Sequence, residues 1–87
     1  RRKVALRGGR IIELSAKEFA LLEYFMRNAG RVVTRADISE KAWDITYDTG
    51  TNIVEVYVNI LRKKIDRDFD TKLIHTRIGL GYIFTDS

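Results

Sequence analysis

Residues 51–66, TNIVEVYVNILRKKID, constrain the fold most, because they predict one amphipathic helix with two chemically different faces. At about 100° per residue, four aliphatic side chains share a narrow stripe that suits packing on a core. These side chains are Val54, Val58, Leu61 and Ile65. The opposite face carries Asn52, Val56, Asn59 and Lys63, and it is flanked by Glu55, Ile60 and Arg62. We therefore predict a helix with a buried stripe and a polar, cationic outer face.

The outer face of this helix has the chemistry that suits the floor of a DNA major groove. Side-chain amides pair bidentately with adenine, a cation reaches phosphate or guanine, and a small apolar group contacts a thymine methyl. The same face is also typical of any amphipathic helix that has one side in water. The helix alone leaves both interpretations open.

Composition indicates a small single domain with a modest excess of positive charge. The 87 residues are expected to form one domain, 1–87, and 45% apolar content is enough for a core. Sixteen basic and 12 acidic residues give a net charge of +4, which favours an anionic partner but also fits an ordinary basic domain. No cysteine is present, so disulfides, thiolate nucleophiles and zinc–thiolate sites are excluded. No signal peptide or long apolar run indicates export or a membrane span.

The N-terminal third predicts a β-hairpin followed by a helix. Two apolar runs, 4–6 and 11–14, flank Gly8-Gly9, a dipeptide that allows the positive φ angles of a tight turn. Ser15 and Glu18 then match a capping box at the start of a helix. The expected core stripe of this helix, which ends before Gly30, consists of Phe19, Leu22, Phe25, Met26 and Ala29.

The middle of the chain predicts a second, short helix and a polar loop. After a short extended link at Val32-Val33, Thr34 and Asp37 again have capping-box spacing, so a helix is expected over 35–43. The loop DITYDTG follows, and Thr49 or Thr51 would cap the third helix. Its aspartates would repel phosphate, so the loop is expected to face away from any nucleic acid and is free to contact a protein. Its physical character alone favours a simple connector.

The C-terminal residues predict a second hairpin. After a turn, RDFDTK, the segments 73–77 and 82–85 have strand composition and are joined through two glycines in 78–81. The whole order is a hairpin, three helices and a hairpin directly after the helix with the cationic face. This order predicts an α+β winged helix-turn-helix, in which the third helix enters the major groove and the hairpin reaches the neighbouring backbone or minor groove.

Three segments, in this order, resemble the effector domain of the OmpR/PhoB family of response regulators, which are winged-helix transcription factors. The segment LSAKEFALLEYFMRNAGRVVTRADISEKAW resembles the first two helices of the family. The segment TNIVEVYVNILRKKID resembles its recognition helix, and LIHTRIGLGYIF resembles its wing. The segment IDRDFDTKLIHT is similar to the copper-responsive branch of the family. The resemblance implies a larger N-terminal sheet and a phosphorylatable receiver domain, so the first strands and the receiver are expected outside residues 1–87.

The resemblance also implies which residues contact DNA. In the recognition helix it implies groove contacts from Val56, Asn59, Ile60 and Lys63, and phosphate contacts from Asn52, Tyr57 and Arg62. In the wing it implies contacts from Thr76, Arg77, Ile78 and Tyr82. Where the family usually has two arginines, this chain has Asn59 and Ile60, which favours amide and methyl readout. Ile78 occupies the place of the arginine that normally enters the minor groove, and Arg77 points to the opposite face of its strand.

The resemblance implies several partners and no cofactor. Double-stranded DNA would be bound at tandem, head-to-tail sites, by a domain that is monomeric alone and dimerises on DNA or through a receiver that a sensor kinase phosphorylates. RNA polymerase would contact the loop through Asp44, Tyr47 and Asp48. The protein is expected to be bacterial and cytoplasmic.

Two other classes of function fit the sequence less well. Catalysis is not expected, because His75 is the only histidine and has no cysteine to join it, while Asp66 and Asp68 lie in a predicted turn where solvation explains them. A winged-helix module that binds proteins without reading DNA is the remaining alternative. It predicts that Asn52, Asn59 and Lys63 tolerate alanine without loss of partner binding.

Overall fold

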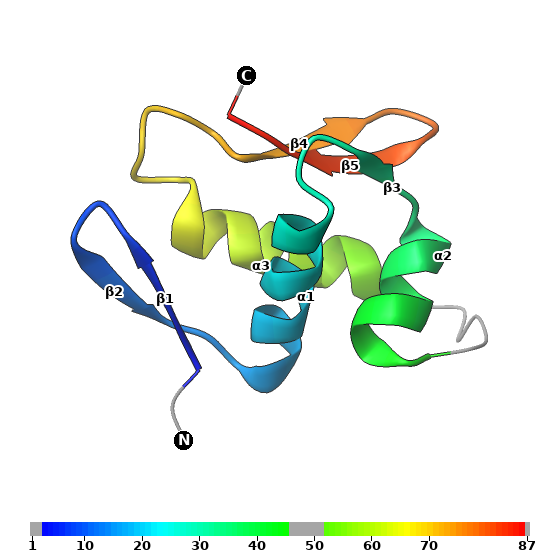
Figure 1. Cartoon of the computed structure of the whole chain (residues 1–87), viewed down its shortest axis with the longest axis horizontal. Coiled ribbons are helices and arrows are strands. Elements are labelled where there is room, and N and C mark those ends of the chain that lie inside the picture. The colour runs from blue at the N-terminus through cyan, green and yellow to red at the C-terminus, as the bar shows by residue number, and fades with distance from the viewer. Residues whose placement is uncertain (1–2, 46–51, 87) are drawn as a thin grey trace.

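The chain has the predicted α+β architecture. The computed structural model describes residues 3–45 and 52–86. The elements in chain order are β1 (Val4–Arg7), β2 (Arg10–Glu13), α1 (Ala16–Arg27), β3 (Val32–Val33), α2 (Arg35–Asp37), η1 (Ile38–Ala42), α3 (Ile53–Ile65), β4 (Ile74–Arg77) and β5 (Gly81–Phe84). Figure 1 shows the helices in the middle of the molecule, with the β1–β2 hairpin to one side and the β3–β5–β4 sheet across another. We call the β4–β5 hairpin, with its turn 78–80, the wing.

The N-terminal hairpin and the start of α1 confirm the local sequence signals. β1 and β2 pair antiparallel around Gly8 and Gly9, whose φ angles are 58° and 79°. At the start of α1, the Glu18 N–H donates to Ser15 Oγ at 3.2 Å, and the Ser15 N–H donates to Glu18 Oε1 at 3.0 Å. This capping box satisfies two backbone donors that the helix itself leaves unpaired.

The buried face of α1 differs from the predicted stripe. Leu22 and Phe25 are buried as expected, but Phe19 is only half-buried, and Met26 is 60% exposed. Ala29 lies beyond the end of the helix and is exposed. The most buried position is instead Leu21, because α1 packs against α3 and η1 with a face rotated toward Leu21. The predicted apolar stripe of α1 is therefore centred on the wrong residues, because helical periodicity carries no information on where the neighbouring helices lie.

The second helical segment begins as predicted and then widens. Thr34 and Asp37 form a reciprocal capping box, and Ile38 is fully buried. One α-helical turn, α2, continues as the π-helical segment η1 rather than as the single α-helix expected over 35–43. The end of this segment brings Trp43 against α1, where its indole N–H donates to the Lys17 carbonyl at 2.9 Å.

The C-terminal sheet has one strand more than the predicted hairpin. Val32-Val33, expected as an extended link, forms β3 and pairs antiparallel with β5, so that β5 lies between β3 and β4. Val33 and Tyr82 are partners in this pairing, and both are buried. Gly81 permits the close approach, because a Cβ there would lie 2.1 Å from the Val33 carbonyl oxygen.

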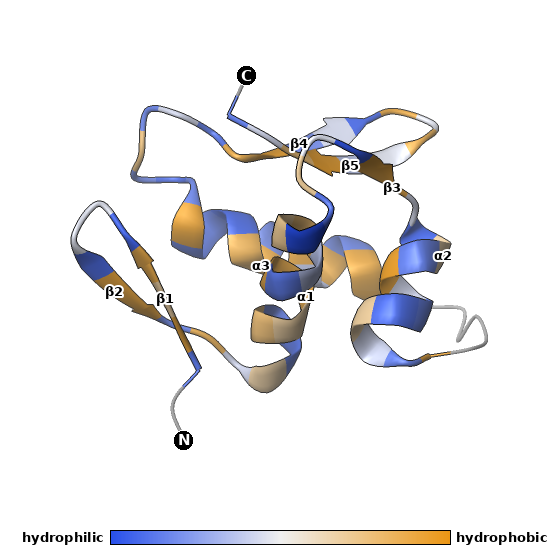
Figure 2. Ribbon diagram, viewed as in Figure 1, coloured by the Kyte–Doolittle hydropathy of each residue, from blue (hydrophilic) through white to orange (hydrophobic). Residues whose placement is uncertain are grey.

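The core lies where α1, η1, α3 and the C-terminal sheet meet. The predicted stripe of α3 is confirmed: Val54, Val58, Leu61 and Ile65 are all buried. The stacked rings of Phe25 and Phe84, with centroids 6.1 Å apart, join α1 to β5. Figure 2 shows the hydrophilic colour on the outward sides of the helices, as expected when the apolar stripes face the core.

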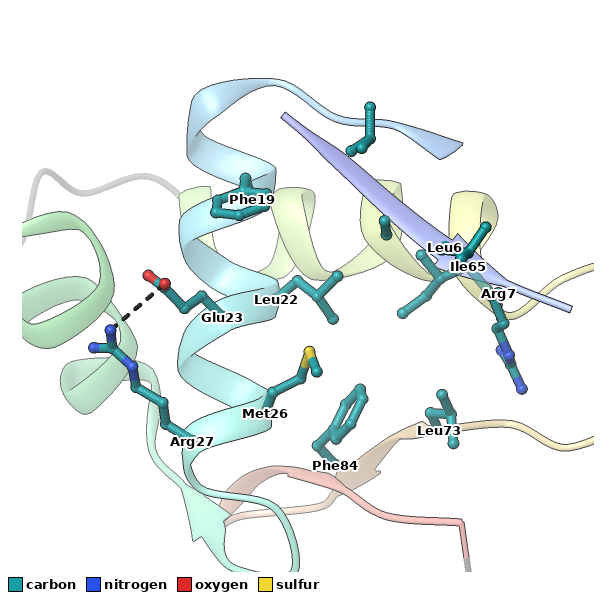
Figure 3. Close-up of a pocket in the computed structure, with 12 residues that line it drawn as sticks. Leu6, Arg7, Phe19, Leu22, Glu23, Met26, Arg27, Ile65, Leu73 and Phe84 are labelled. Atoms are coloured by element: carbon teal, nitrogen blue, oxygen red, sulfur yellow. Dashed lines mark hydrogen bonds and ion pairs between the residues drawn. The ribbon is translucent and has the colours of Figure 1, made fainter. Parts of the chain in front are cut away.

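An apolar groove of about 580 Å³ lies between β1, α1 and the C-terminal strands. Figure 3 shows Phe19, Leu22 and Met26 along one wall, Leu6 and Ile65 along another, and Leu73 and Phe84 at its lower end. Leu6 is 73% exposed and Met26 is 60% exposed. Met26, although apolar, therefore lines this groove instead of packing in the core.

Candidate nucleic-acid interface

The outer face of α3 is exposed, as the sequence predicts. Asn52, Asn59 and Lys63 are exposed, and Val56 is 51% exposed. Asn52 occupies the N-cap position of α3 but makes no side-chain capping bond. Thr49 and Thr51, the predicted caps, lie outside the described residues. The amide of Asn52 is therefore not committed to capping the helix.

A basic groove of about 690 Å³ runs between the C-terminal half of α3 and β4. Its lining residues are Asn59, Arg62, Lys63, Asp66, Arg67, Lys72, Ile74, His75, Thr76 and Arg77. Its single carboxylate, Asp66, is buried and paired with Arg7, so the charge that the groove presents to solvent is positive. A groove with cationic walls attracts phosphate.

Arg67 and Lys72 belong to this groove, although the sequence interpretation did not select them. Both come from the segment between α3 and β4, for which the sequence predicts only a turn. The Lys72 ammonium donates to the carbonyls of Asp66 and Phe69 at 2.8 and 2.6 Å, which fixes the path of this turn. Basic residues that directly follow a recognition helix are the signal that could have identified them.

Arg62 connects α3 to the wing. Its guanidinium donates a hydrogen bond to Thr76 Oγ1, and its Cζ lies 5.7 Å from the centroid of the Tyr82 ring. Arg62 is half-buried, and its Nε has no hydrogen-bond partner within residues 3–45 and 52–86. Two predicted DNA-binding residues, Arg62 and Thr76, thus bind each other, and this contact sets the orientation of the wing relative to α3.

Tyr82 lies underneath the wing rather than on its surface. Its exposure is 6%, and burial together with the nearby Glu55 raises the pKa of its phenol, which stays neutral at physiological pH. We therefore expect Tyr82 to support the wing from the core side instead of contacting a duplex. The family motif alone did not distinguish a supporting tyrosine from an exposed one.

The other wing residues that are predicted to contact DNA are exposed. Thr76 and Arg77 lie on β4, and Ile78 begins the turn and is 95% exposed. Behind them, His75 Nε2 lies 3.1 Å from the Thr85 carbonyl, which ties the two strands together at the base of the wing. The wing thus presents one cation, Arg77, and two exposed aliphatic side chains, Ile78 and Leu80, near its tip.

Tyr57 and Ile60 occupy the flanks of α3. Both are half-buried. The Tyr57 ring packs edge-to-face on Trp43, with centroids 5.5 Å apart, and the Lys17 ammonium lies 5.0 Å from the Trp43 ring. Tyr57 therefore serves the packing of α3 on the second helical segment, whatever contact its hydroxyl makes.

The predicted polymerase loop is described only at its start. Asp44 is exposed and adopts a φ of 55°, and the Ile45 N–H donates to the Ser39 carbonyl at 2.8 Å. Tyr47 and Asp48 lie outside the described residues.

Neither a metal cluster nor a membrane-spanning helix is found in the parts of the chain that the structure describes. Residues 3–45 and 52–86 contain no group of three or more His, Cys, Asp or Glu side chains that could hold a metal ion. None of the helices in these two ranges has the length and apolar character needed to cross a bilayer.

A family comparison agrees with this geometry. The model of the family described as "Transcriptional regulatory protein, C terminal" matches residues 9–84. The chain belongs to this family. It has the winged-helix fold of the effector domains of OmpR/PhoB-type response regulators.

Similar proteins include several bacterial regulators. The chain is 49% identical over 82 residues to the transcriptional regulatory protein CusR of Escherichia coli K12. The aligned region covers 94% of this chain and 36% of CusR. It is 44% identical to PcoR of Escherichia coli, again over 94% of this chain and 36% of the relative. It is 45% identical to the response regulator MprA of Mycobacterium leprae, over 99% of this chain and 37% of MprA. CusR and PcoR are in keeping with the branch of the family that residues 65–76 resemble. The chain spans little more than a third of the length of these relatives.

Solved structures of OmpR/PhoB-type domains have the same fold. The DNA-binding domain of Klebsiella pneumoniae RstA, in complex with the RstA box, superposes with a TM-score of 0.83 at 28% identity, covering 97% of this chain and 84% of that one. The DNA-binding domain of Escherichia coli CpxR gives a TM-score of 0.81 at 26% identity, covering 97% and 83%. The winged-helix prediction is thereby confirmed.

Proposed function

We propose that this effector domain recognises a specific double-stranded DNA sequence by placing α3 in the major groove and the wing at the adjacent backbone or minor groove. The observation that carries the proposal is the continuous surface formed by the exposed face of α3 and the basic groove beside β4. Its length and positive charge suit a duplex rather than a small anion. Because the similar proteins are regulators of transcription, we propose binding without catalysis.

The two halves of this surface are assigned different roles. Asn59 and Val56 lie exposed at the centre of α3, where an amide and a small apolar side chain can read base edges. Lys63, Arg67 and Arg77 line or border the basic groove, where cations hold phosphates irrespective of sequence. Sequence preference is therefore assigned to the middle of α3, and general affinity to the groove.

The domain is proposed to be the output part of a longer two-component response regulator. The relatives it matches are about three times its length, which leaves room for a receiver domain phosphorylated by a sensor kinase. In that arrangement the domain alone is a monomer that binds weakly in the cytoplasm, and paired receivers bring two copies to tandem sites. Linking two binding domains raises their joint affinity by effective concentration.

The apolar groove is proposed to be covered by strands that precede residue 1 in the longer protein. It exposes Leu6 and Met26, and β1 pairs on one edge only, with β2, within the described residues. The matched RstA domain extends beyond the region shared with this chain. An added strand would pair with the free edge of β1 and bury these side chains.

A contact with RNA polymerase is proposed for the loop after Trp43. Asp44, exposed at the start of the loop, supports this proposal together with the acidic character of residues 44–50. DNA phosphates repel an acidic loop, which makes a protein with a basic surface the better partner.

An amide chemical-shift titration of the 87-residue chain with a mixed-sequence 30-base-pair duplex tests the DNA interface. At low salt we expect shifts over residues 52–63 and 76–81, and weaker shifts at moderate salt, because phosphate contacts release counterions. Lys63→Ala should weaken binding several-fold. Arg27→Ala, which removes one exposed positive charge from α1 beside the apolar groove, is the matched control and should change little.

The absence of shifts at low salt would contradict the proposal and favour a protein-interaction module. Shifts confined to the N-terminal hairpin would show that DNA binds there and not at α3 and the wing. Equal losses from Lys63→Ala and Arg27→Ala would show that only net charge matters.

A further inference from the structure

The tip of the wing carries two exposed aliphatic side chains. Ile78 is 95% exposed and Leu80 is 63% exposed, and they are the first and last residues of the three-residue turn 78–80. Figure 2 shows the hydrophobic colour on this projecting turn. Single exposed aliphatic residues are common on protein surfaces, but two at the tip of a projecting hairpin form a small apolar end that folding does not explain.

The turn holds these side chains in a fixed geometry. The Leu80 N–H donates to the Arg77 carbonyl at 2.9 Å, and Gly79 between them adopts a φ of 80°. At the base of the turn, Gly81 lies against the Val33 carbonyl, so β3 braces the wing. A braced turn loses little conformational entropy when it is inserted into a partner.

The surroundings of the tip indicate what that partner is. Arg77 precedes Ile78 directly and is exposed, and it lines the basic groove together with Lys63 and Arg67. An apolar tip next to cations suits insertion into the DNA minor groove, because the side chain can enter between bases while the cations face the phosphates at the rims of the groove. Minor-groove proteins insert Ile, Leu, Phe, Met or Pro between base steps and kink the duplex.

We propose that Ile78, supported by Leu80, is an apolar wedge that enters the minor groove beside the α3 site and partly unstacks one base step. The proposal rests on the proposed DNA binding and adds the means of readout by the wing. Pyrimidine–purine steps are the easiest to unstack. The wing would therefore select a TA or CA/TG step at a fixed distance from the bases read by α3, and the bound DNA would be bent.

Selection from a pool of random 30-base-pair duplexes tests the wedge, using the unaltered chain, Ile78→Ser and Leu6→Ser. Leu6→Ser is the matched control, because it also removes an exposed aliphatic side chain but lies on the N-terminal hairpin, away from the wing (Figure 1). The unaltered chain and Leu6→Ser should both recover a major-groove motif with a flexible step beside it. Ile78→Ser should recover the motif without the step and bind the selected duplex about five- to tenfold more weakly.

Unstacking is then measured directly with 2-aminopurine placed at the selected step. Its fluorescence should rise at least about twofold on binding of the unaltered chain and Leu6→Ser, and stay near the free-duplex value with Ile78→Ser. Thermal unfolding should give the same Tm for Ile78→Ser as for the unaltered chain, because the side chain is almost fully exposed. An unchanged Tm rules out misfolding as the cause.

Three outcomes overturn the proposal, and only the first of them also contradicts the proposed DNA binding. If the unaltered chain recovers no duplex above the protein-free control, DNA binding itself fails. If Ile78→Ser recovers the same motif and step with equal affinity and fluorescence, DNA binding stands and the wedge is wrong. If Ile78→Ser loses only the cooperativity of two copies on tandem sites, the tip contacts a neighbouring copy and not the minor groove.

Discussion

Arg7 Nη1 lies 2.8 Å from Asp66 Oδ1, and this ion pair joins the N-terminal hairpin to the end of the recognition helix. The same carboxylate accepts hydrogen bonds from the N–H groups of Leu73 and Ile74 at 3.1 and 3.0 Å, where β4 begins. Asp66 thus connects three parts of the domain: the hairpin, α3 and the wing. The expectation that Asp66 is a solvated turn residue is wrong, because its exposure is only 4%.

Replacing Asp66 should therefore lower the free energy of unfolding markedly. Asp66→Asn keeps an acceptor for the backbone N–H groups but leaves the Arg7 guanidinium, whose side chain is 18% exposed, without its counter-charge. We expect a loss of about 2–3 kcal/mol in urea unfolding followed by circular dichroism. Asp68→Asn is the control, because its pair with Arg10 is about half exposed on both sides and should contribute less than about 1 kcal/mol. Equal losses from the two variants would contradict the role of Asp66.

Glu18 should make the stability depend on pH. Burial raises the pKa of its carboxyl, but hydrogen bonds from the Lys64 ammonium, at 2.6 Å, and the Ser15 N–H outweigh burial and leave the pKa below its ordinary value of 4.5. The unfolded chain then binds the proton more readily than the folded chain. The stabilisation is complete above about pH 4.5 and is lost as the pH falls through the lower pKa of the folded state.

Glu18→Gln tests this dependence. At pH 7 it should lower the free energy of unfolding by about 1–2 kcal/mol, since the capping box and the Lys64 pair are weakened. The difference from the unaltered chain should shrink as the pH is lowered toward about 3. Glu23→Gln, at an exposed pair with Arg27, is the control and should leave the curve unchanged. Parallel curves for Glu18→Gln and the unaltered chain would show that the charge of Glu18 is irrelevant.

Local signals in the sequence were sufficient for most of the secondary structure and for the two faces of α3. Capping boxes, turn glycines and helical periodicity act over three or four residues, and each of these predictions is confirmed at Ser15, Thr34, Gly8 and the buried stripe of α3. The sequence predicts the cap of the third helix at Thr49 or Thr51, whereas Asn52 holds the N-cap position of α3.

Features that depend on distant partners could not be predicted in this way. The strand β3 has only two residues, and its partner β5 lies about fifty positions later. The burial of Asp66 depends on Arg7, and the exposure of Met26 depends on where the N-terminal hairpin lies. At the interface, the sequence placed Arg62, Thr76 and Tyr82 on the DNA side, but only the folded chain reveals that Arg62 binds Thr76 and that Tyr82 is buried.

The close contact between Gly81 and β3 predicts that the wing does not tolerate a side chain at this position. In Gly81→Ala the Cβ would meet the Val33 carbonyl at 2.1 Å, at a φ of 142° that is unfavourable for alanine. We expect a loss of more than about 2 kcal/mol in the free energy of unfolding. Gly79→Ala, in the same wing but with nothing within 4 Å, should lose only about 1–2 kcal/mol through its positive φ. Losses of the same size would mean that the steric contact relaxes at little cost.

Asn59 and Lys63 should affect DNA binding in different ways, although both are exposed on the same face of α3. Asn59→Ala should relax sequence preference, because an amide that reads a base edge contributes about 1–3 kcal/mol of discrimination. Lys63→Ala should weaken binding evenly across sequences and reduce the salt slope by about one, as expected for a lost phosphate contact. Fluorescence anisotropy on the selected duplex and on single-base variants, at three salt concentrations, separates these effects. If both variants lost the same affinity on every sequence, the division between base reading by Asn59 and phosphate binding by Lys63 would be wrong.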